Sequence, residues 1–372
     1  MGINQVRIVD EFTKLVAIDS PSHKEREMGD YVKKKLKALG MIVIEDDAGE
    51  RTGGNCGNIY GFMNGDSARR PLLFVAHLDT VEPSRGKAAV IADDGTIRSR
   101  GNTVLGADDL TGVASILEAL TVIKEQALPH GPIEVLFTVA EEVYCKGSQV
   151  FEFAKVMSEE AYILDLMGPV GTAAYAAPSI LSFTATIHGR ASHAGFSPQK
   201  GIHAIAVAAD AISLMPMGRI DEETSMNVGT ITGGLGTNIV PEKCVVKGEV
   251  RSLNHGKAKR QAELIKKQFE RSCSAARAAL DFEVYSASKA YEIPPEHPVV
   301  MRFEKACNKL KLPVSLIKTF GGSDNNVIAQ NGIAGLVVAN AMNRIHACDE
   351  FTTVEEIIRA ADLTLMLMTI ED

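Results

Sequence analysis

Histidines and carboxylates follow several apolar runs of the sequence. Side chains of these types can bind metals or transfer protons, so a catalytic role is considered first. The run "LLFVAHLDTV", residues 72–81, places His77 and Asp79 at the end of a segment that is typical of a buried strand. Residues two apart on a strand point to the same side, so His77 is a candidate metal ligand and Asp79 a candidate partner that orients it. The alternative for this pair alone is a buried histidine hydrogen-bonded to an aspartate for structural reasons.

Two pairs of adjacent acidic residues follow. Asp108 and Asp109 open a predicted helix in "LGADDLTGVAS", where acidic side chains also suit capping and the helix dipole. Glu141 and Glu142 end the apolar run "VLFTVAEE", where two like charges must be desolvated side by side. A cation bound to one glutamate relieves that conflict and leaves the other as a general base. The aspartate pair alone favours capping, whereas the glutamate pair favours chemistry.

Asp165 and His346 complete a candidate ligand set. Asp165 ends the apolar run "AYILDL", and His346 lies in "NRIHACDEF", after a strand predicted from "GLVVAN". Two histidines and three carboxylates suit two divalent cations, with one carboxylate and a water shared between them. The three carboxylates are Asp108, Glu142 and Asp165. With a bridging hydroxide they balance two dications, Glu141 stands beside them as general base, and zinc favours such mixed ligands.

The elements that must position these residues form an α/β pattern. Strands alternate with amphipathic helices, and sites of such layered sheets lie at the carboxyl ends of the strands. From about residue 179, alternating apolar and polar residues indicate half-exposed antiparallel strands, and the α/β pattern returns after about residue 287. We therefore predict a mixed, largely parallel sheet flanked by helices, built from residues 1–178 and 288–372, with an α+β lid or dimerisation domain inserted at 179–287.

Composition and charge limit the classes of partner that the protein is expected to bind. The chain of 372 residues carries a formal net charge of −8 and no long basic run, which argues against nucleic acid. No apolar stretch reaches the length of a membrane-spanning helix, and the N-terminal segment lacks the pattern of a signal peptide. The six cysteines are scattered without a C-x-x-C pair, which suits reduced thiols. We expect a cytoplasmic protein with neither nucleic acid nor a membrane as partner.

The order of these motifs resembles the di-zinc aminoacylase/carboxypeptidase-type metallopeptidases, and within them the peptidase T group of tripeptide aminopeptidases and their shorter relatives. H-L-D-T-V, G-A-D-D, E-E, a lone aspartate and I-H-x-x-x-E occur in that order across essentially the whole chain. In the inserted segment, "GRASHAGFSPQKGIHAI", "GGLGTNIVPEKC" and "GEVRSL" are similar to lid motifs of the family. The resemblance implies a zinc-peptidase-like fold, two zinc ions per chain (cobalt or manganese would also fit), a short-peptide substrate, and a homodimer formed through the lid.

The resemblance also implies a role for each residue. His77 and Asp165 would hold one metal, Glu142 and His346 the other, and the carboxylate of Asp108 would bridge them. The peptide bond between Asp108 and Asp109 would be cis. Asp79 would orient His77, and Glu141 would be the general base and acid.

In the lid, His193 would stabilise the oxyanion, and Asn238 and Arg251 would bind the substrate carboxylate. Gly322 and Ser323 would form a pocket wall, and a helix cap is the alternative for them.

Three places bordering the expected site depart from the family pattern. Leu110 follows the aspartate pair in place of a lysine, and Val143, Tyr144 and Cys145 follow the glutamate pair in place of a small residue and glycine. Leu166 and Met167 replace polar residues after the lone aspartate. None of these three departures removes a proposed ligand or the base. A hydrolase is therefore still expected, but the departures leave its substrate undetermined.

Two other functions remain as alternatives. An N-acyl amino acid deacylase of the same architecture differs in whether the pocket recognises a free α-amino group. A metal-retaining binding module without chemistry is the other, and Glu141 argues against it because such a site needs no second carboxylate. A nucleotide-binding enzyme is disfavoured, since "GGLGTNIV" does not complete G-x-G-x-x-G and no P-loop occurs.

Overall fold

The chain divides into two compact units in the computed structural model, which describes residues 2–371. The first unit runs to Tyr175 and resumes over Glu292–Thr319 and from Ser323 onward, and the second comprises Ala176–Tyr291 and Phe320–Gly322. The predicted insertion, 179–287, lies within the second unit. Residues 176–178, 288–291 and 320–322, which the sequence placed in the catalytic domain, also belong to the second unit.

Phe320 illustrates why that boundary differs from the prediction. Its carbonyl oxygen accepts a hydrogen bond of 2.8 Å from Arg251 Nη1, and the Arg219 guanidinium lies 3.7 Å from its ring centroid. Both arginines belong to the second unit. A three-residue segment attached by such side-chain contacts leaves no signal in hydrophobic periodicity.

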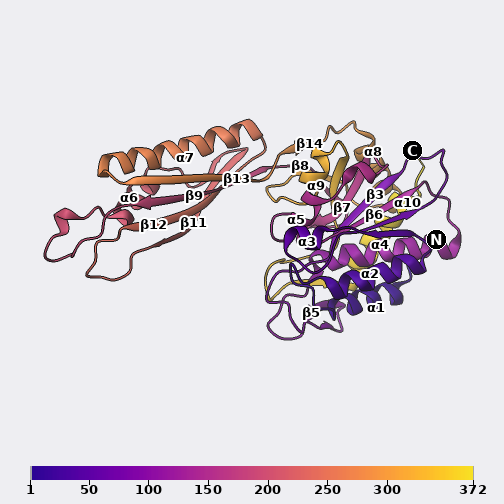
Figure 1. Cartoon of the computed structure of the whole chain (residues 1–372). Helices are drawn as coiled ribbons and strands as arrows, with labels where there is room; N and C mark the ends of the chain where they lie inside the picture. Colours follow the sequence, from indigo (N-terminus) through magenta and orange to yellow (C-terminus); the bar gives the residue numbers. More distant parts are fainter. Residues whose placement is uncertain (1, 372) are drawn as a thin grey trace. The chain divides into compact units, whose positions relative to one another are not determined.

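The first unit is built on a mixed sheet flanked by helices (Figure 1). Within the described residues this sheet has nine strands in the order β1-β2-β6-β3-β7-β16-β8-β14, with β15 paired to β8. The middle strands β6, β3, β7 and β16 are parallel, whereas β1, β2 and β8 pair antiparallel with their neighbours. The predicted α/β fold class is confirmed. The strands are β1 (Ile42–Glu45), β2 (Ile59–Met63), β3 (Leu72–His77), β6 (Ile133–Thr138), β7 (Glu160–Leu166), β8 (Thr172–Ala177), β14 (Tyr291–Glu292), β15 (Ser315–Lys318) and β16 (Ala334–Ala339).

The helices of this unit cover apolar strands. Every residue of β3 and β6 is buried, as expected for central parallel strands covered on both faces. A small antiparallel sheet, β17-β5-β4, accompanies them and is built from Phe351–Thr353, Thr96–Ser99 and Ala89–Ile91. The helices are α1 (Gln5–Val16), α2 (Arg26–Ala38), α3 (Ala48–Thr52), α4 (Ala107–Gln126), α5 (Lys146–Val150), α8 (Pro298–Leu310), α9 (Asn325–Gln330) and α10 (Val354–Thr369).

The second unit is an antiparallel sheet, β10-β11-β12-β9-β13, with α6 and α7 packed against it (Figure 1). From Leu181 onward, buried and partly buried residues alternate along β9, as predicted for a half-exposed strand. Phe183 and Phe269 belong to the core between sheet and helices. The elements are β9 (Ser179–His188), β10 (Gly218–Asp221), β11 (Thr224–Gly233), β12 (Lys243–Ser252), β13 (Ala279–Ser288), α6 (Ala204–Ser213) and α7 (His255–Ala276).

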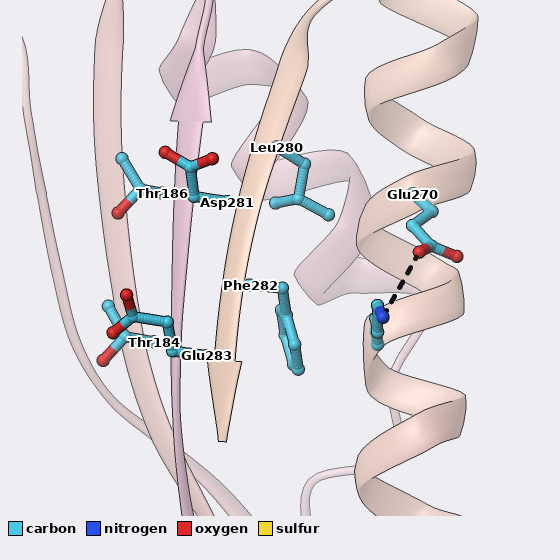
Figure 2. Close-up of a pocket in the computed structure, with 8 residues that line it drawn as sticks. Thr184, Thr186, Glu270, Leu280, Asp281, Phe282 and Glu283 are labelled. Atoms are coloured by element: carbon cyan, nitrogen blue, oxygen red, sulfur yellow. Dashed lines mark ion pairs between the residues drawn. The ribbon is translucent and has the colours of Figure 1, made fainter. Parts of the chain in front are cut away.

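A groove of about 600 Å³ follows β13, the edge strand of this sheet (Figure 2). Leu280 and Phe282 point toward α7, whereas Asp281 and Glu283 point to the opposite face of the sheet. Edge strands present backbone groups that can pair with another chain.

Two further properties concern the whole chain. Across residues 2–371, the helices are each too short or too polar to cross a membrane. All six cysteines are free thiols, and five of them are buried.

Candidate metal centre

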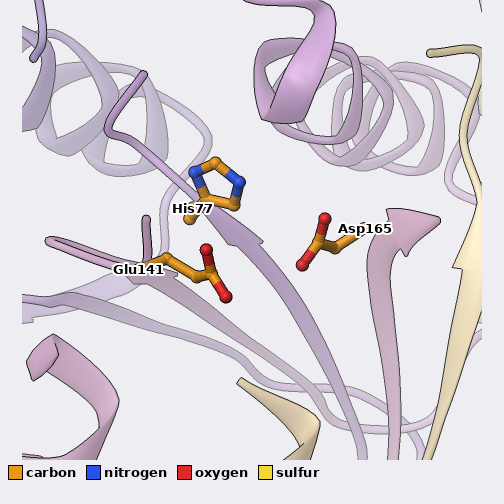
Figure 3. Close-up of side chains that lie close together, drawn as sticks. All are labelled: His77, Glu141 and Asp165. Atoms are coloured by element: carbon orange, nitrogen blue, oxygen red, sulfur yellow. The ribbon is translucent and has the colours of Figure 1, made fainter. Parts of the chain in front are cut away.

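Three parallel strands bring the first cluster together. His77 is the last residue of β3, Asp165 lies near the end of β7, and Glu141 follows the end of β6. Since these strands are neighbours and run parallel, their carboxyl ends meet at one edge of the sheet. Ligand atoms of all three residues lie within 4.8 Å of one another, and their side chains point into a common space (Figure 3).

A second cluster shares His77 and adds Asp108 and Glu142. Ligand atoms of these three residues also lie within 4.8 Å of one another. His77 Nε2 lies 3.0 Å from Asp108 Oδ1, and His346 Nε2 lies 3.3 Å from Asp108 Oδ2 and 3.0 Å from Glu142 Oε2. Asp108 therefore stands between the two histidines, each of which faces one of its carboxylate oxygens.

The turn before α4 fixes Asp108. Gly106 adopts a left-handed φ of 77°, and the Asp108–Asp109 peptide bond is cis, as the resemblance implied. Asp109 supports the cluster from behind. Its Oδ2 accepts the backbone N–H of His77 at 3.0 Å, and its Oδ1 accepts Asn340 Nδ2 at 2.6 Å. The second aspartate of the pair thus ties α4 to β3.

Asp79 contacts His77 mainly through its backbone. The carbonyl oxygen lies 2.8 Å from His77 Nδ1, whereas the carboxylate oxygen Oδ1 lies 3.6 Å away. The carboxylate accepts the backbone N–H groups of Glu141 and Glu142 at 2.9 and 3.2 Å, and the hydroxyl of Ser22 at 2.7 Å. Asp79 therefore holds both the imidazole and the turn that presents the two glutamates.

The carboxylates at this edge of the sheet oppose one another electrostatically. Burial raises the pKa of Glu141 well above its usual value, and Asp324 reinforces this against the charge of His77. Burial also raises the pKa of Asp165, together with the charges of Asp108 and Glu141. Hydrogen bonds to Asp108 and Glu142 raise the pKa of His346 to about 10. This cluster of buried carboxylates therefore favours the binding of a positively charged group.

These residues fit divalent cations. Imidazole and carboxylate groups are the ligands that zinc takes in catalytic sites. Glu142 Oε1 is buried and accepts no hydrogen bond within the part of the chain that the structure describes. A buried carboxylate oxygen without a donor is costly, and a cation would satisfy it.

Several residues that sequence reasoning did not select support the centre. Glu350 is buried and accepts the backbone N–H groups of Gly106 and Asp108 at 2.7 and 3.0 Å. Asp324 is buried beside Glu141, where it accepts hydroxyls from Thr138 and Ser148, each at 2.5 Å. Glu350 lies within the I-H-x-x-x-E motif and Asp324 directly follows Ser323, so both adjoin residues that the motifs indicate.

His193 occupies an exposed loop of the second unit. Its Nδ1 accepts the backbone N–H groups of Gly195 and Phe196, both at 3.1 Å. The ring centroid lies 4.4 Å from that of Phe196, which is 86% exposed. The backbone carbonyl oxygen of Asn238 accepts the backbone N–H of Ala194 at 3.0 Å. Because Nδ1 is an acceptor, Nε2 carries the imidazole hydrogen.

Two of the remaining predicted substrate residues, Arg251 and Ser323, already have hydrogen-bond partners. Arg251 donates to both Glu249 carboxylate oxygens, at 2.7 and 3.3 Å, as well as to Phe320. Gly322 is exposed in the second unit. Ser323 is buried in the first unit, where its Oγ accepts the backbone N–H of Asn325 at 3.3 Å at the start of α9.

The positions that depart from the family pattern differ in exposure. Leu110 is fully buried in α4, directly after Asp109. Tyr144 and Met167 are 52% and 48% exposed. Cys145 is buried, with its Sγ 3.2 Å from Glu141 Oε1.

Comparison with known proteins places this geometry in a family. Residues 175–277 match the Peptidase dimerisation domain, and residues 58–209 match Peptidase family M28. The protein YqjE of Bacillus subtilis strain 168 is 37% identical over 368 residues, which cover 98% of each chain.

Solved structures agree. A tripeptidase from Staphylococcus aureus aligns with a TM-score of 0.96 at 32% identity, covering 99% of both chains. The aminopeptidase PepT from Bacillus cereus aligns with a TM-score of 0.92 at 38% identity, covering 99% of this chain and 98% of that one. The fold and the two clusters define a metal-dependent peptidase. The chain belongs to the peptidase T-like M20 metallopeptidases.

Proposed function

We propose that the chain is a dinuclear zinc aminopeptidase that removes the N-terminal residue from short peptides, tripeptides above all. The observation that carries this proposal is the convergence of imidazoles and carboxylates at the carboxyl ends of β3, β6 and β7. The likeness to the Staphylococcus aureus tripeptidase and to the Bacillus cereus aminopeptidase supports an exopeptidase that reads the free amino end.

Five residues would hold the two metals. In this proposal His77 and Asp165 hold one zinc ion, Glu142 and His346 hold the other, and Asp108 bridges them. Cobalt and manganese accept the same ligands and are alternatives. When bound, the metals supply Lewis acidity, which polarises the scissile carbonyl and lowers the pKa of a water molecule.

Glu141 would move the proton. Its carboxylate lies within 4.8 Å of the ligand atoms of His77 and Asp165, where it would accept a proton from the attacking water and return it to the leaving amine. Asp79 would serve this step indirectly, because it holds the backbone N–H of Glu141 and the ring of His77. These contacts fix the position of the base, Glu141, relative to the proposed ligand His77.

The second unit would act as the lid and would contribute substrate contacts. His193 presents an Nε2–H that would donate to the oxyanion of the tetrahedral intermediate. Arg251 and Asn238 would bind the carboxylate end of the peptide, and Gly322 and Ser323 would line the pocket.

We also propose a homodimer formed through the second unit and a cytoplasmic location. The match of residues 175–277 to a peptidase dimerisation domain supports the dimer. The edge strand β13 offers one surface for pairing. Free thiols at all six cysteines suit a reducing compartment. Sedimentation at micromolar concentration should give about twice the chain mass of 39.9 kDa, and a sedimenting monomer would oppose the dimer.

Turnover of a defined panel tests the function. Wild type, Glu141→Gln and the exposed control Glu27→Gln would be assayed on trialanine, dialanine and N-acetylmethionine, with metal content measured on each. We expect tripeptide cleavage by wild type and control, and its loss in Glu141→Gln with metal retained. Cleavage of N-acetylmethionine alone would identify a deacylase, and bound metal without turnover of any substrate would indicate a binding module.

A further inference from the structure

The turn that presents the two glutamates has an unusual backbone. Tyr144 and Cys145 adopt left-handed φ values of 73° and 53° in succession. Such values are uncommon for residues other than glycine and cost free energy, and they concentrate at functional sites. Several hydrogen bonds impose the conformation. Cys145 N–H donates to the Glu141 carbonyl at 2.7 Å, and Lys146 N–H donates to the Ala140 carbonyl at 3.0 Å.

This backbone aims one side chain at the base. Cys145 Sγ lies 3.2 Å from Glu141 Oε1, so the thiol donates to that oxygen. Cys145 thus holds Glu141 twice, by its amide at the backbone and by its thiol at the carboxylate. The sulfur keeps its proton, because burial and the neighbouring carboxylates of Glu141 and Asp324 raise the pKa of the thiol well above its usual value.

The contact distinguishes the two oxygens of Glu141. Oε1 accepts the thiol, whereas no residue between 2 and 371 donates a hydrogen bond to Oε2. A glutamate side chain has three rotatable bonds, and proton transfer requires one placement within hydrogen-bond reach of the water. A donor that fixes one oxygen therefore leaves the other in a defined place.

We propose that Cys145 is a positioning residue for the peptidase reaction, whose thiol hydrogen bond to Oε1 fixes the Glu141 carboxylate so that Oε2 handles the proton. This inference rests on the proposed role of Glu141 as the base. In this proposal the sulfur itself takes no part in bond making.

Four variants test the proposal on trialanine, with kcat, KM, metal content and thermal midpoint measured for each. Cys145→Ala removes the donor, and Cys145→Gly removes it while suiting the left-handed backbone. The glycine variant therefore decides the question if the alanine variant fails to fold. Cys145→Ser restores a hydroxyl donor. Cys307→Ala is the matched control, because it deletes another buried thiol of the first unit.

We expect the alanine and glycine variants to lower kcat about three- to tenfold, as befits loss of one weak hydrogen bond to a charged group, with KM within about twofold. Metal content should be unchanged, serine should restore kcat to within about twofold, and the Cys307 control should match wild type. Equal loss in the serine, alanine and glycine variants would overturn the proposal, as would wild-type kcat or loss of metal in the glycine variant. Failure of the underlying function is distinct, since wild type would then not cleave trialanine or Glu141→Gln would retain activity.

Discussion

Replacement of Glu350 by glutamine should loosen the metal centre without touching a ligand. The Glu350 carboxylate is 1% exposed and accepts the N–H groups of Gly106 and Asp108 at 2.7 and 3.0 Å. Glutamine keeps one acceptor oxygen and turns its NH2 toward the other amide, so one hydrogen bond to a charged group is lost and a buried N–H is left unpaired. The lost hydrogen bond costs about 1.5–3 kcal/mol, but burial raises the pKa of Glu350 to about 7, so its charge opposes folding above that pH and glutamine removes this opposition. The two effects oppose each other in the metal-free protein, so we expect its unfolding free energy at pH 8 to change by less than about 2 kcal/mol.

The same substitution should weaken metal binding. Asp108 is the proposed bridging ligand, and Glu350 holds its backbone N–H. Loss of a partner that orients a ligand typically reduces metal affinity by about 10–100-fold. Urea denaturation of the metal-free protein and a zinc titration at pH 8 measure the two effects, with the exposed Glu355→Gln as control. A zinc affinity equal to that of wild type would refute the reasoning.

Three further predictions concern pH and the lid. Burial would raise the pKa of Glu45, but Arg26 and Lys33 lower it to about 2 from 4.5, so stability present above pH 4.5 is lost as the pH falls toward 2. Glu45→Gln should reduce the stability lost between pH 5 and pH 3, as measured by denaturation at both pH values. The reduction should be less than about 1 kcal/mol, because these ion pairs are partly exposed. Burial lowers the pKa of Lys87 from 10.5 to about 8, so the unfolded chain binds more protons and stability rises over that interval. Lys87→Met should abolish the rise in denaturation series from pH 7.5 to 10, and persistence of the rise would exclude Lys87 as its source. His193→Asn keeps an acceptor for the loop amides but loses the Nε2 donor, so kcat should fall about 100-fold with metal retained; unchanged kcat would remove His193 from the oxyanion site.

The sequence predicts the parts of the centre that lie at strand ends. His77, Glu141 and Asp165 each terminate an apolar run, and parallel neighbouring strands must bring such ends together. The order of the motifs then indicates the family, which the relatives and solved structures bear out. Buried strands and long amphipathic helices could be predicted equally well, because their hydrophobic periodicity reflects burial directly.

The supporting residues could not be predicted in the same way. Glu350 meets Asp108 across a separation of 242 residues, and Asn340 meets Asp109 across 231. Nothing local in either segment indicates the partner, since the hydrogen bond depends on tertiary packing. Cys145 looked like an apolar change at the rim of the site. Its contact with Glu141 depends on a left-handed backbone conformation, which cannot be predicted from a cysteine at this position.

Metal stoichiometry tests the central claim most directly. Wild type, Asp108→Asn and the exposed control Asp94→Asn would be loaded with zinc, freed of excess metal and analysed by elemental mass spectrometry. The account predicts two zinc ions per chain in wild type and control, and fewer than one in Asp108→Asn, because both proposed metals share that carboxylate. A wild-type chain that binds no zinc, or an Asp108→Asn variant that still binds two, would contradict it.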